Sequence, residues 1–273
     1  MQNITFFSPL DGVDSLSELM ELPYFEFLAC IGEFSMHPGG SVTTQEVLNA
    51  AQVCVGESVL EIGSGTGWTT SRLIESGTQV TIVEKSPRML AATLRNCRRA
   101  SLSTPQFVFG SAEVLSDLPA GKFDLALYEC ILGFVSDKRH AIAECKRVLN
   151  PIRSRIGVVD VHYVSSPPRE ILEQMEKIFL TPVEPLFEAD WKQLFSDFDL
   201  VYWKTSDLPP IISPTAEEIK QMLINSQLLD EMRWADESIF EVLSQRWAKW
   251  EKIFAENRKY LEVHVAIWAT PLL

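Results

Sequence analysis

The chain has 273 residues, 46% of them hydrophobic, and a formal net charge of −13. This length suits one α/β core with an appended cap and is short for two ordinary domains. An acidic surface repels phosphate backbones and anionic lipid, so nucleic acid and membranes are disfavoured as partners. The five cysteines form no C-x-x-C pair, and neither a basic, apolar leader nor an apolar run of membrane-spanning length is present. These features predict a cytoplasmic protein with reduced thiols and no structural zinc.

From residue 58 onward, apolar runs typical of strands alternate with amphipathic segments typical of helices. Strands are expected at 58–62, 79–84, 106–110, from 123 onward, and at 155–164. The intervening helices are expected at 68–77, 86–100 and 137–151, and Ser86 and Pro87 are placed to start the second of them. Strands separated by helices of this length predict an α/β fold with a doubly wound, mostly parallel sheet.

Two later segments depart from this alternation. Residues 199–207 and 262–272 are typical of a sixth and a seventh strand, and the stretch between them has the pattern of two helices. The cap that these helices form carries more apolar surface than a lone helix pair can leave in water. Part of it must therefore pack on the sheet or on the segment around Tyr24, Phe25 and Phe27. We expect the chain to divide into an N-terminal helical lid segment 1–57, an α/β core 58–207, a helical cap insertion 208–260 and the last core strand 261–273.

The stretch SVLEIGSGTGWTT, residues 58–70, places Gly63, Gly65 and Gly67 directly behind the first strand. A glycine-rich turn between a strand and a helix lets a ligand approach the backbone closely. The spacing G-x-G-x-G differs from the G-x-G-x-x-G of nicotinamide and flavin enzymes, which disfavours a dehydrogenase. Two acids accompany the glycines: Glu61 lies two residues before the first glycine, and Glu84 ends the second strand.

These two acids indicate the chemistry of the ligand. Glu84 is placed to accept both hydroxyls of a ribose, as an acid at this position does in dinucleotide folds. Glu61 would repel a pyrophosphate and is suited instead to a positively charged ammonium group. A ligand with an adenosine ribose and an ammonium group, but no phosphate, is S-adenosylmethionine (SAM).

Five segments in order, VLEIGSGTG, VTIVEKS, FVFGSAEVL, FDLALYECIL and KRVLNP, resemble the class I SAM-dependent methyltransferases. The resemblance is greatest to the small-molecule branch, similar to the enzymes of ubiquinone and menaquinone biosynthesis, and covers about residues 37–162. It implies a Rossmann-like fold of seven strands, in which the last strand is antiparallel and inserted between the fifth and the sixth. It also implies SAM as the cofactor.

The resemblance assigns the cofactor contacts residue by residue. It implies that the glycine loop passes close to the methionine portion, that Glu61 holds the amino group and that Glu84 binds the ribose hydroxyls. Ser111 stands where the family usually has Asp, and either its hydroxyl or Glu113 would accept from the adenine amine. The full set of expected cofactor-binding residues is Glu61, Gly63, Ser64, Gly65, Gly67, Glu84, Lys85, Ser111, Ala112 and Tyr128.

Methyl transfer from a sulfonium requires the acceptor close to the methyl group, exclusion of water and in some reactions a base. His37 lies in a glycine-rich loop that similar enzymes fold over the cofactor, before a helix that a Thr43–Glu46 capping box would start. A role in the core or in a lid is equally compatible with each of the histidines considered. For Glu129, an ordinary solvated position at a strand end is the alternative. No metal-ligand cluster is evident, so we expect catalysis without a metal ion. The candidate catalytic residues are His37, Glu129 and His162.

We expect a SAM-dependent methyltransferase that acts on nitrogen or oxygen of a small, apolar or aromatic metabolite, such as one of secondary metabolism. Nitrogen is slightly favoured, because acidic and aromatic surroundings favour a cation. The alternative from another class is a SAM-binding regulatory or partner subunit without catalysis. A nucleic-acid or protein methyltransferase is disfavoured by the net charge, and because YECI stands where methylation of base and amide amino groups uses N/D-P-P-Y. The sequence leaves the oligomeric state open, a homodimer included.

Overall fold

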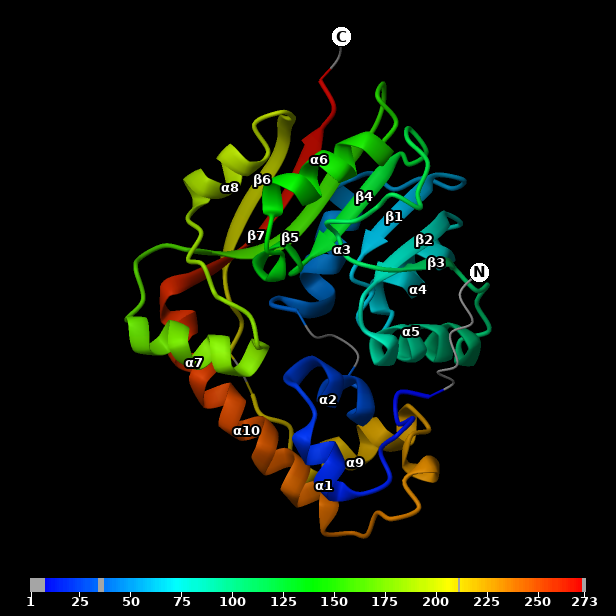
Figure 1. Cartoon of the computed structure of the whole chain (residues 1–273), viewed down its shortest axis with the longest axis vertical. Helices are drawn as coiled ribbons and strands as arrows, with labels where there is room; N and C mark the ends of the chain where they lie inside the picture. The colour runs from blue at the N-terminus through cyan, green and yellow to red at the C-terminus, as the bar shows by residue number, and fades with distance from the viewer. Residues whose placement is uncertain (1–7, 34–36, 211, 272–273) are drawn as a thin grey trace.

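A seven-stranded sheet in the order β3-β2-β1-β4-β5-β7-β6 forms the centre of the protein (Figure 1). The structure is a computed structural model that describes residues 8–33, 37–210 and 212–271. The pairs from β3 to β5 are parallel, whereas β7 runs antiparallel to both β5 and β6. This topology confirms the fold predicted from the sequence, including the place of the last strand. The strands are β1 Ser58–Ile62, β2 Gln79–Glu84, β3 Gln106–Phe109, β4 Leu125–Glu129, β5 Arg155–Tyr163, β6 Asp199–Asp207 and β7 Leu261–Ala269.

Each face of the sheet has its own layer of helices, because successive strand residues point to opposite faces. Leu60 and Ile62 of β1 are buried with residues of α6 (Lys138–Val148) and α8 (Glu188–Leu194). Val59 is buried on the other face, with residues of α3 (Gly40–Ala50), α4 (Trp68–Glu75) and α5 (Pro87–Arg99). With both faces covered, a ligand reaches the sheet at the strand ends.

A second hydrophobic core lies below the sheet in the view of Figure 1. Trp250 of α10 (Ile239–Asn257) packs edge-on against Tyr24 and Phe27 of α2 (Tyr24–Ile31). The cap is therefore built from two distant parts of the chain, and the insertion packs on the N-terminal segment as its apolar residues require. The other elements of this region are α1 Leu16–Glu21, α7 Arg169–Phe179 and α9 Ala216–Asn225, and the short 3₁₀ helices of the described chain are η1 Leu132–Phe134, η2 Leu229–Glu231 and η3 Arg258–Tyr260.

The N-terminal segment is divided between the cap and the sheet. Helices α1 and α2 contribute to the core of the cap, whereas Val47 of α3 is buried against the sheet. Helix α3 begins at Gly40, after Gly39 in the left-handed conformation. Thr43 lies inside its first turn and donates to the backbone of Pro38, while Glu46 accepts from Tyr202. The predicted Thr43–Glu46 capping box is therefore wrong, because the N-cap of the helix is Gly39, four residues before Thr43.

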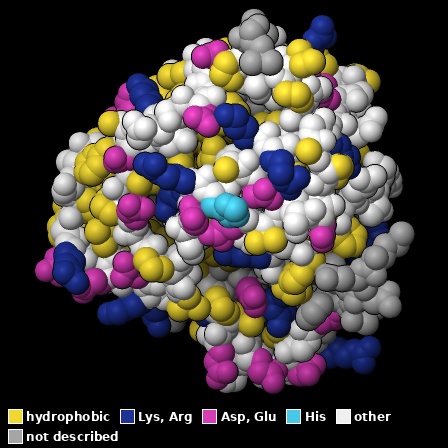
Figure 2. All heavy atoms as spheres, turned by 45° about the horizontal axis from the view of Figure 1, so that its top comes forward, with side chains coloured by type: hydrophobic (Ala, Val, Ile, Leu, Met, Phe, Trp, Pro, Cys, Tyr) yellow, Lys and Arg dark blue, Asp and Glu magenta, His cyan; other side chains and the backbone are white. Residues whose placement is uncertain are grey.

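The described surface carries charges of both signs. Figure 2 shows Asp and Glu side chains interspersed with Lys and Arg on one face, with hydrophobic side chains scattered among them. The described part of this face has no extended basic field of the kind that nucleic acid requires. Among the helices that the structure describes, none combines the length and the apolar character needed to cross a membrane.

Gly157 of β5 lies where the sheet packs closely against Val47 of α3. A Cβ atom there would lie 2.6 Å from Leu127 Cδ2 and 3.0 Å from Val47 Cγ2. We expect Gly157→Val to lower the free energy of unfolding by about 1–3 kcal/mol through overpacking. Urea denaturation followed by circular dichroism measures the change. Gly110→Ala is the control, because the nearest atom to its Cβ would be 3.8 Å away. Equal stability of the two variants would contradict the packing argument.

Candidate active site

The carboxyl ends of the parallel strands open into a cavity of about 1110 Å³ that extends under the cap. Its wall combines the glycine loop after β1 with residues from β2, β4 and β5 and with residues of α2, α7 and α10. This edge is where open α/β sheets bind their ligands. We call this space the central cavity.

The glycine loop forms one wall of the central cavity with bare backbone. Gly63 and Gly65 have φ of 77° and 54°, a region that glycine adopts without steric cost. A Cβ atom on Gly63 would also lie 2.1 Å from Ile131 Cδ1. Ser64 lines the same wall, and its hydroxyl accepts from Thr93 at 3.0 Å. A ligand can therefore lie directly against the chain between β1 and α4.

Glu61 is buried beside this loop and lines the central cavity. Thr70 Oγ1 donates to its carboxylate at 2.6 Å. Burial raises the pKa of Glu61 well above its usual value, and the charges of Glu129 and Glu84 add to the effect, which the Thr70 hydrogen bond opposes. A cationic group in the cavity would favour the ionised form of this carboxyl. The surroundings of Glu61 thus fit the ammonium group of SAM.

Glu84 lies at the end of β2 and is buried as well. The backbone N–H groups of Ser86 and Gly65 donate to its two oxygens at 2.9 and 3.3 Å. Burial raises its pKa, while these backbone donors lower it. Carboxylate oxygens have further lone pairs, so Glu84 can also accept from the hydroxyls of a ribose. The position fits the role expected for it.

The residues expected near adenine lie together at the rim of the central cavity. Lys85, Ser111 and Ala112 all line it. The Ser111 hydroxyl donates to Glu113 at 3.1 Å, and the other carboxylate oxygen of Glu113 accepts from the backbone of Asp137 at 2.7 Å. Both alternatives for the adenine amine, the Ser111 hydroxyl and the Glu113 carboxylate, are therefore held in one place.

Gly67 and Tyr128 do not line the central cavity, contrary to the sequence-based expectation. Gly67, with φ of 92°, precedes α4, and a Cβ atom there would lie 3.0 Å from the backbone of Thr93 in α5. Its role is close packing of two helices. Tyr128 alternates to the opposite face of the sheet from Glu129, where its ring is fully buried in the core beneath α6. Its hydroxyl lies beside Cys145, and burial raises its pKa.

His37 and Glu129, two of the candidate catalytic residues, meet in the central cavity. His37 Nε2 lies 3.0 Å from Glu129 Oε2, which also accepts from the hydroxyls of Thr44 and Thr69 at 3.0 and 2.9 Å. Burial alone would lower the pKa of His37, but the hydrogen bond and charge of Glu129 outweigh it and raise the pKa. The loop that carries His37 is thereby fixed to the end of β4.

His162, the third candidate, lies away from the central cavity. Its ring is buried 5.3 Å from the ring of His264 and 6.0 Å from that of Trp203. Burial lowers its pKa. His162 points from the same face of β5 as Asp160, but its ring lies beside those of Trp203 and His264 from the neighbouring strands and does not line the central cavity. It packs in the core, and this placement does not fit the expected role as a base.

Asp160, which strand alternation places on the same side of the fifth strand as His162, was not among the candidate site residues predicted from the sequence. Its Oδ1 accepts from the backbone of Val161 at 2.8 Å, and the residue lines the central cavity. Burial raises the pKa of Asp160 to about 7, although the backbone N–H groups around it lower the value. The sequence feature that could have identified Asp160 is an acidic residue near the end of the fifth predicted strand. Thr44, Thr69 and Thr70 gave no signal at all, since hydroxyls at helix starts are common.

Aromatic rings form the far wall of the central cavity. Phe134 lies 5.2 Å from Phe25 and 4.9 Å from Phe179, measured between ring centroids. The ring centroid of Phe254 lies 5.7 Å from that of Phe179 and 5.2 Å from that of Tyr24. These five rings come from α2, η1, α7 and α10. They provide an apolar space of a size that suits a ring or a short alkyl chain.

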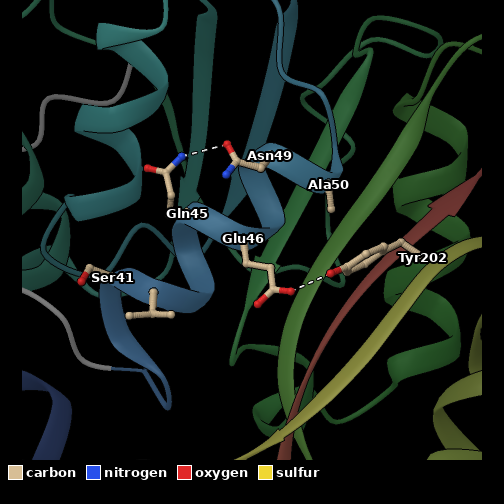
Figure 3. A pocket seen from close by; sticks show the side chains of 7 residues that line it. Ser41, Gln45, Glu46, Asn49, Ala50 and Tyr202 are labelled. Atoms are coloured by element: carbon tan, nitrogen blue, oxygen red, sulfur yellow. Dashed lines mark hydrogen bonds between the residues drawn. The ribbon is translucent and has the colours of Figure 1, made fainter.

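A second hollow lies on the outer side of α3 (Figure 3). Glu46 points across it to Tyr202 of β6, whose hydroxyl donates to the carboxylate at 2.6 Å. It is shallow and open, and none of the cofactor motif residues lines it. Within residues 8–33, 37–210 and 212–271, no group of three or more His, Cys, Asp or Glu side chains is arranged to hold a metal ion.

The inserted antiparallel strand, the G-x-G-x-G loop and the acids of β1 and β2 together define a class of protein. The fold and the site are those of the class I SAM-dependent methyltransferases, and SAM is the cofactor. Residues 60–152 match the family described as methyltransferase domain.

Individual relatives agree with this assignment. The chain is 29% identical over 189 residues to an uncharacterized methyltransferase, YodH, of Bacillus subtilis, covering 68% of this chain and 78% of that protein. It is 31% identical over 133 residues to a demethylmenaquinone methyltransferase of Tropheryma whipplei, covering 49% of this chain and 52% of that one. A solved phosphoethanolamine N-methyltransferase 2 of Haemonchus contortus, in complex with phosphomonomethylethanolamine and S-adenosylhomocysteine (SAH), has the same fold. Its TM-score is 0.65 at 15% identity, over 97% of this chain and 60% of that one.

Glu84→Ala should weaken SAH binding, because the variant cannot accept charge-assisted hydrogen bonds from the ribose. Each such bond contributes about 1.5–3 kcal/mol, so we expect a loss of about tenfold or more in affinity by calorimetry. Glu75→Ala is a matched control on the exposed surface of α4, where Glu75 pairs with Arg72. Unchanged affinity in Glu84→Ala would contradict the placement of the ribose.

The His37–Glu129 pair should stabilise the fold in a pH-dependent manner. Because the folded-state pKa of His37 is raised, this stabilisation is fully present below the unfolded pKa of about 6.5 and is lost as the pH rises through the folded value. Urea unfolding at acidic and alkaline pH measures it as the difference between wild type and His37→Gln. That difference should shrink at high pH and should lose its pH dependence in a Glu129→Gln background. A difference independent of pH in the wild-type background would refute the coupling.

Proposed function

We propose that the protein transfers a methyl group from SAM to nitrogen or oxygen of a small acceptor with an apolar or aromatic body, without a metal ion. One observation carries this proposal: the glycine loop, the His37–Glu129 pair and the aromatic wall all line the same central cavity. A cavity of about 1110 Å³ can hold a cofactor and a small acceptor together. SAM supplies an electrophilic methyl group on a sulfonium.

Different residues of the chain bind different parts of SAM. Glu61 binds the ammonium group, Gly63 to Gly65 give the methionine portion access to the backbone, and Glu84 accepts from the ribose hydroxyls. Ser111 and Glu113 receive the adenine amine, with Lys85 and Ala112 beside the ring. These roles agree with the burial of both acids and with the positive φ of the two glycines.

The reacting end of the acceptor lies at the ends of β4 and β5, between the glycine loop and the aromatic wall. Glu129 fixes and polarises His37, which then acts as the base for an acceptor proton or as the lid that excludes water. Nitrogen is the favoured target, because acidic side chains outnumber Lys and Arg on the cavity wall. The name of the demethylmenaquinone methyltransferase relative is consistent with an apolar ring as acceptor.

Purified protein incubated with methyl-labelled SAM and a panel of small aromatic amines and hydroxyl compounds tests the proposal. We expect transfer to at least one compound, unchanged by EDTA, and a decrease of about 10²-fold or more in Glu129→Gln with SAH affinity retained. His140→Gln, an exposed change on α6, is the control.

Two outcomes would contradict this function. SAH binding without transfer to any compound would favour the alternative of a SAM-binding partner subunit. Turnover that EDTA abolishes and magnesium restores would refute catalysis without a metal ion.

A further inference from the structure

Three buried carboxylate oxygens have no hydrogen-bond partner within the described residues: Glu129 Oε1, Asp160 Oδ2 and Glu251 Oε2. All three residues line the central cavity, although they belong to β4, β5 and α10. Asp160 is only 3% exposed and the Glu129 side chain 9%. Buried polar atoms are nearly always satisfied, so three unpartnered oxygens in residues that line one cavity indicate a ligand that donates hydrogen bonds.

Other acidic residues that line the central cavity have ion-pair or hydrogen-bond partners, unlike these three oxygens. Glu26 pairs with Arg88 at 3.2 Å, Glu184 pairs with Lys138 at 3.2 Å, and Glu61 accepts from Thr70. Cofactor binding accounts for Glu61 and Glu84, which lie at the glycine loop. The unsatisfied oxygens therefore belong to the acceptor side of the cavity.

Glu251 extends this acidic character into the cap. Its Oε1 accepts from Trp247 Nε1 at 2.6 Å. Burial raises its pKa, while the charge of Arg258 lowers it. Burial and the charge of Glu251 raise the pKa of Tyr24, and the ring of Tyr24 contacts that of Phe254. The three acidic residues with unpartnered oxygens thus come from the strand ends and from α10, which also contributes to the aromatic wall.

Rings and carboxylates together recognise organic cations. The faces of aromatic rings attract an ammonium group, and carboxylates accept its N–H bonds. A neutral alcohol could donate only one hydrogen bond, and a carboxylate none. We define the acid–ring cluster as Glu129, Asp160 and Glu251 with Tyr24, Phe25, Phe134, Phe179 and Phe254.

We propose that the acid–ring cluster binds the methyl acceptor as a cation, so that the acceptor is a primary or secondary amine on an apolar body. This inference rests on the proposed function and names the class of its substrate. The ammonium group donates to Asp160 and Glu129, the rings enclose the apolar body, and Glu251 provides the negative potential on the cap side.

Asp160 then prepares the amine for reaction. An ammonium nitrogen has no lone pair, so one N–H bond must break before attack. The proton passes to Asp160 Oδ2, which becomes a neutral carboxyl, and the electron pair of the N–H bond stays on nitrogen. Burial raises the pKa of this group to about 7, which suits proton transfer near neutral pH.

Three probes that share a phenylethyl body test the charge preference on SAH-saturated protein: 2-phenylethylamine, 2-phenylethanol and 3-phenylpropanoate. SAH supplies the donors of the cofactor itself, so only the acceptor side is measured. We expect calorimetry at neutral pH to give an affinity for the amine about tenfold or more above that for the alcohol, with the carboxylate weakest. Equal or stronger binding of the alcohol, or no binding of the amine at millimolar concentration, would overturn the inference.

Two isosteric variants assign the effect to the cluster. Glu251→Gln and Asp160→Asn should each reduce amine binding about fivefold or more and leave alcohol binding unchanged. Glu256→Gln is the matched control on the same helix, where Glu256 is exposed and pairs with Lys259. Loss of both probes together in a variant that still binds SAH would indicate a structural role and count against the inference. Failure of the wild type to bind SAH would instead refute the proposed function.

Discussion

The burial of four carboxyl groups at one edge of the sheet is the constraint on which the site depends. Glu61, Glu84, Glu129 and Asp160 are held at the ends of adjacent strands, where water is largely excluded and like charges interact. The fold offsets this cost with threonine hydroxyls that donate to Glu61 and Glu129 and with backbone N–H groups that donate to Glu84 and Asp160. The N–H of Gly65 donates to Glu84, so the glycine loop both admits a ligand and stabilises an acid. The remaining deficit is positive charge, which a cationic ligand supplies.

The cap is tied to this edge by chain connectivity. Helix α10 leads through η3 directly into β7, the strand paired with β5, and Asn257 accepts from the Tyr163 hydroxyl at 3.1 Å. The insertion therefore cannot move far from Asp160 without disturbing the sheet. From the other end of the chain, α2 brings Tyr24 and Phe25 onto α10 and α7. The aromatic wall arises because the two parts of the cap bury each other's apolar faces over the strand ends.

Local sequence patterns predicted the strands of the sheet well, but they predicted the residues at the acceptor side of the cavity only in part. Residues 79–84 and 199–207 form strands with the predicted bounds, and Ser86 caps α5 as expected, because hydrophobic period and caps are local signals. Strand alternation separated Glu129 from Tyr128, but one motif cannot reveal which of them faces the ligand. Helices α7 and α8 had no predicted counterpart. The pairing of His37 with Glu129, which are 92 positions apart in the chain, is a long-range contact that the glycine-rich sequence around His37 does not specify.

The same electrostatics relates the two ligands of the cavity. SAM carries a sulfonium and an ammonium group, and a cationic acceptor beside it would be repelled in a space of low dielectric constant. Glu129 and Asp160 line the same cavity as the glycine loop and the aromatic wall, and their negative charge would reduce that repulsion. Each added cation also favours ionisation of the acids whose pKa burial has raised, Glu61 and Asp160 among them. Loss of a proton from the acceptor removes one positive charge at the moment when nitrogen must approach the sulfonium. An acidic wall is thus compatible with both binding two cations and releasing one proton.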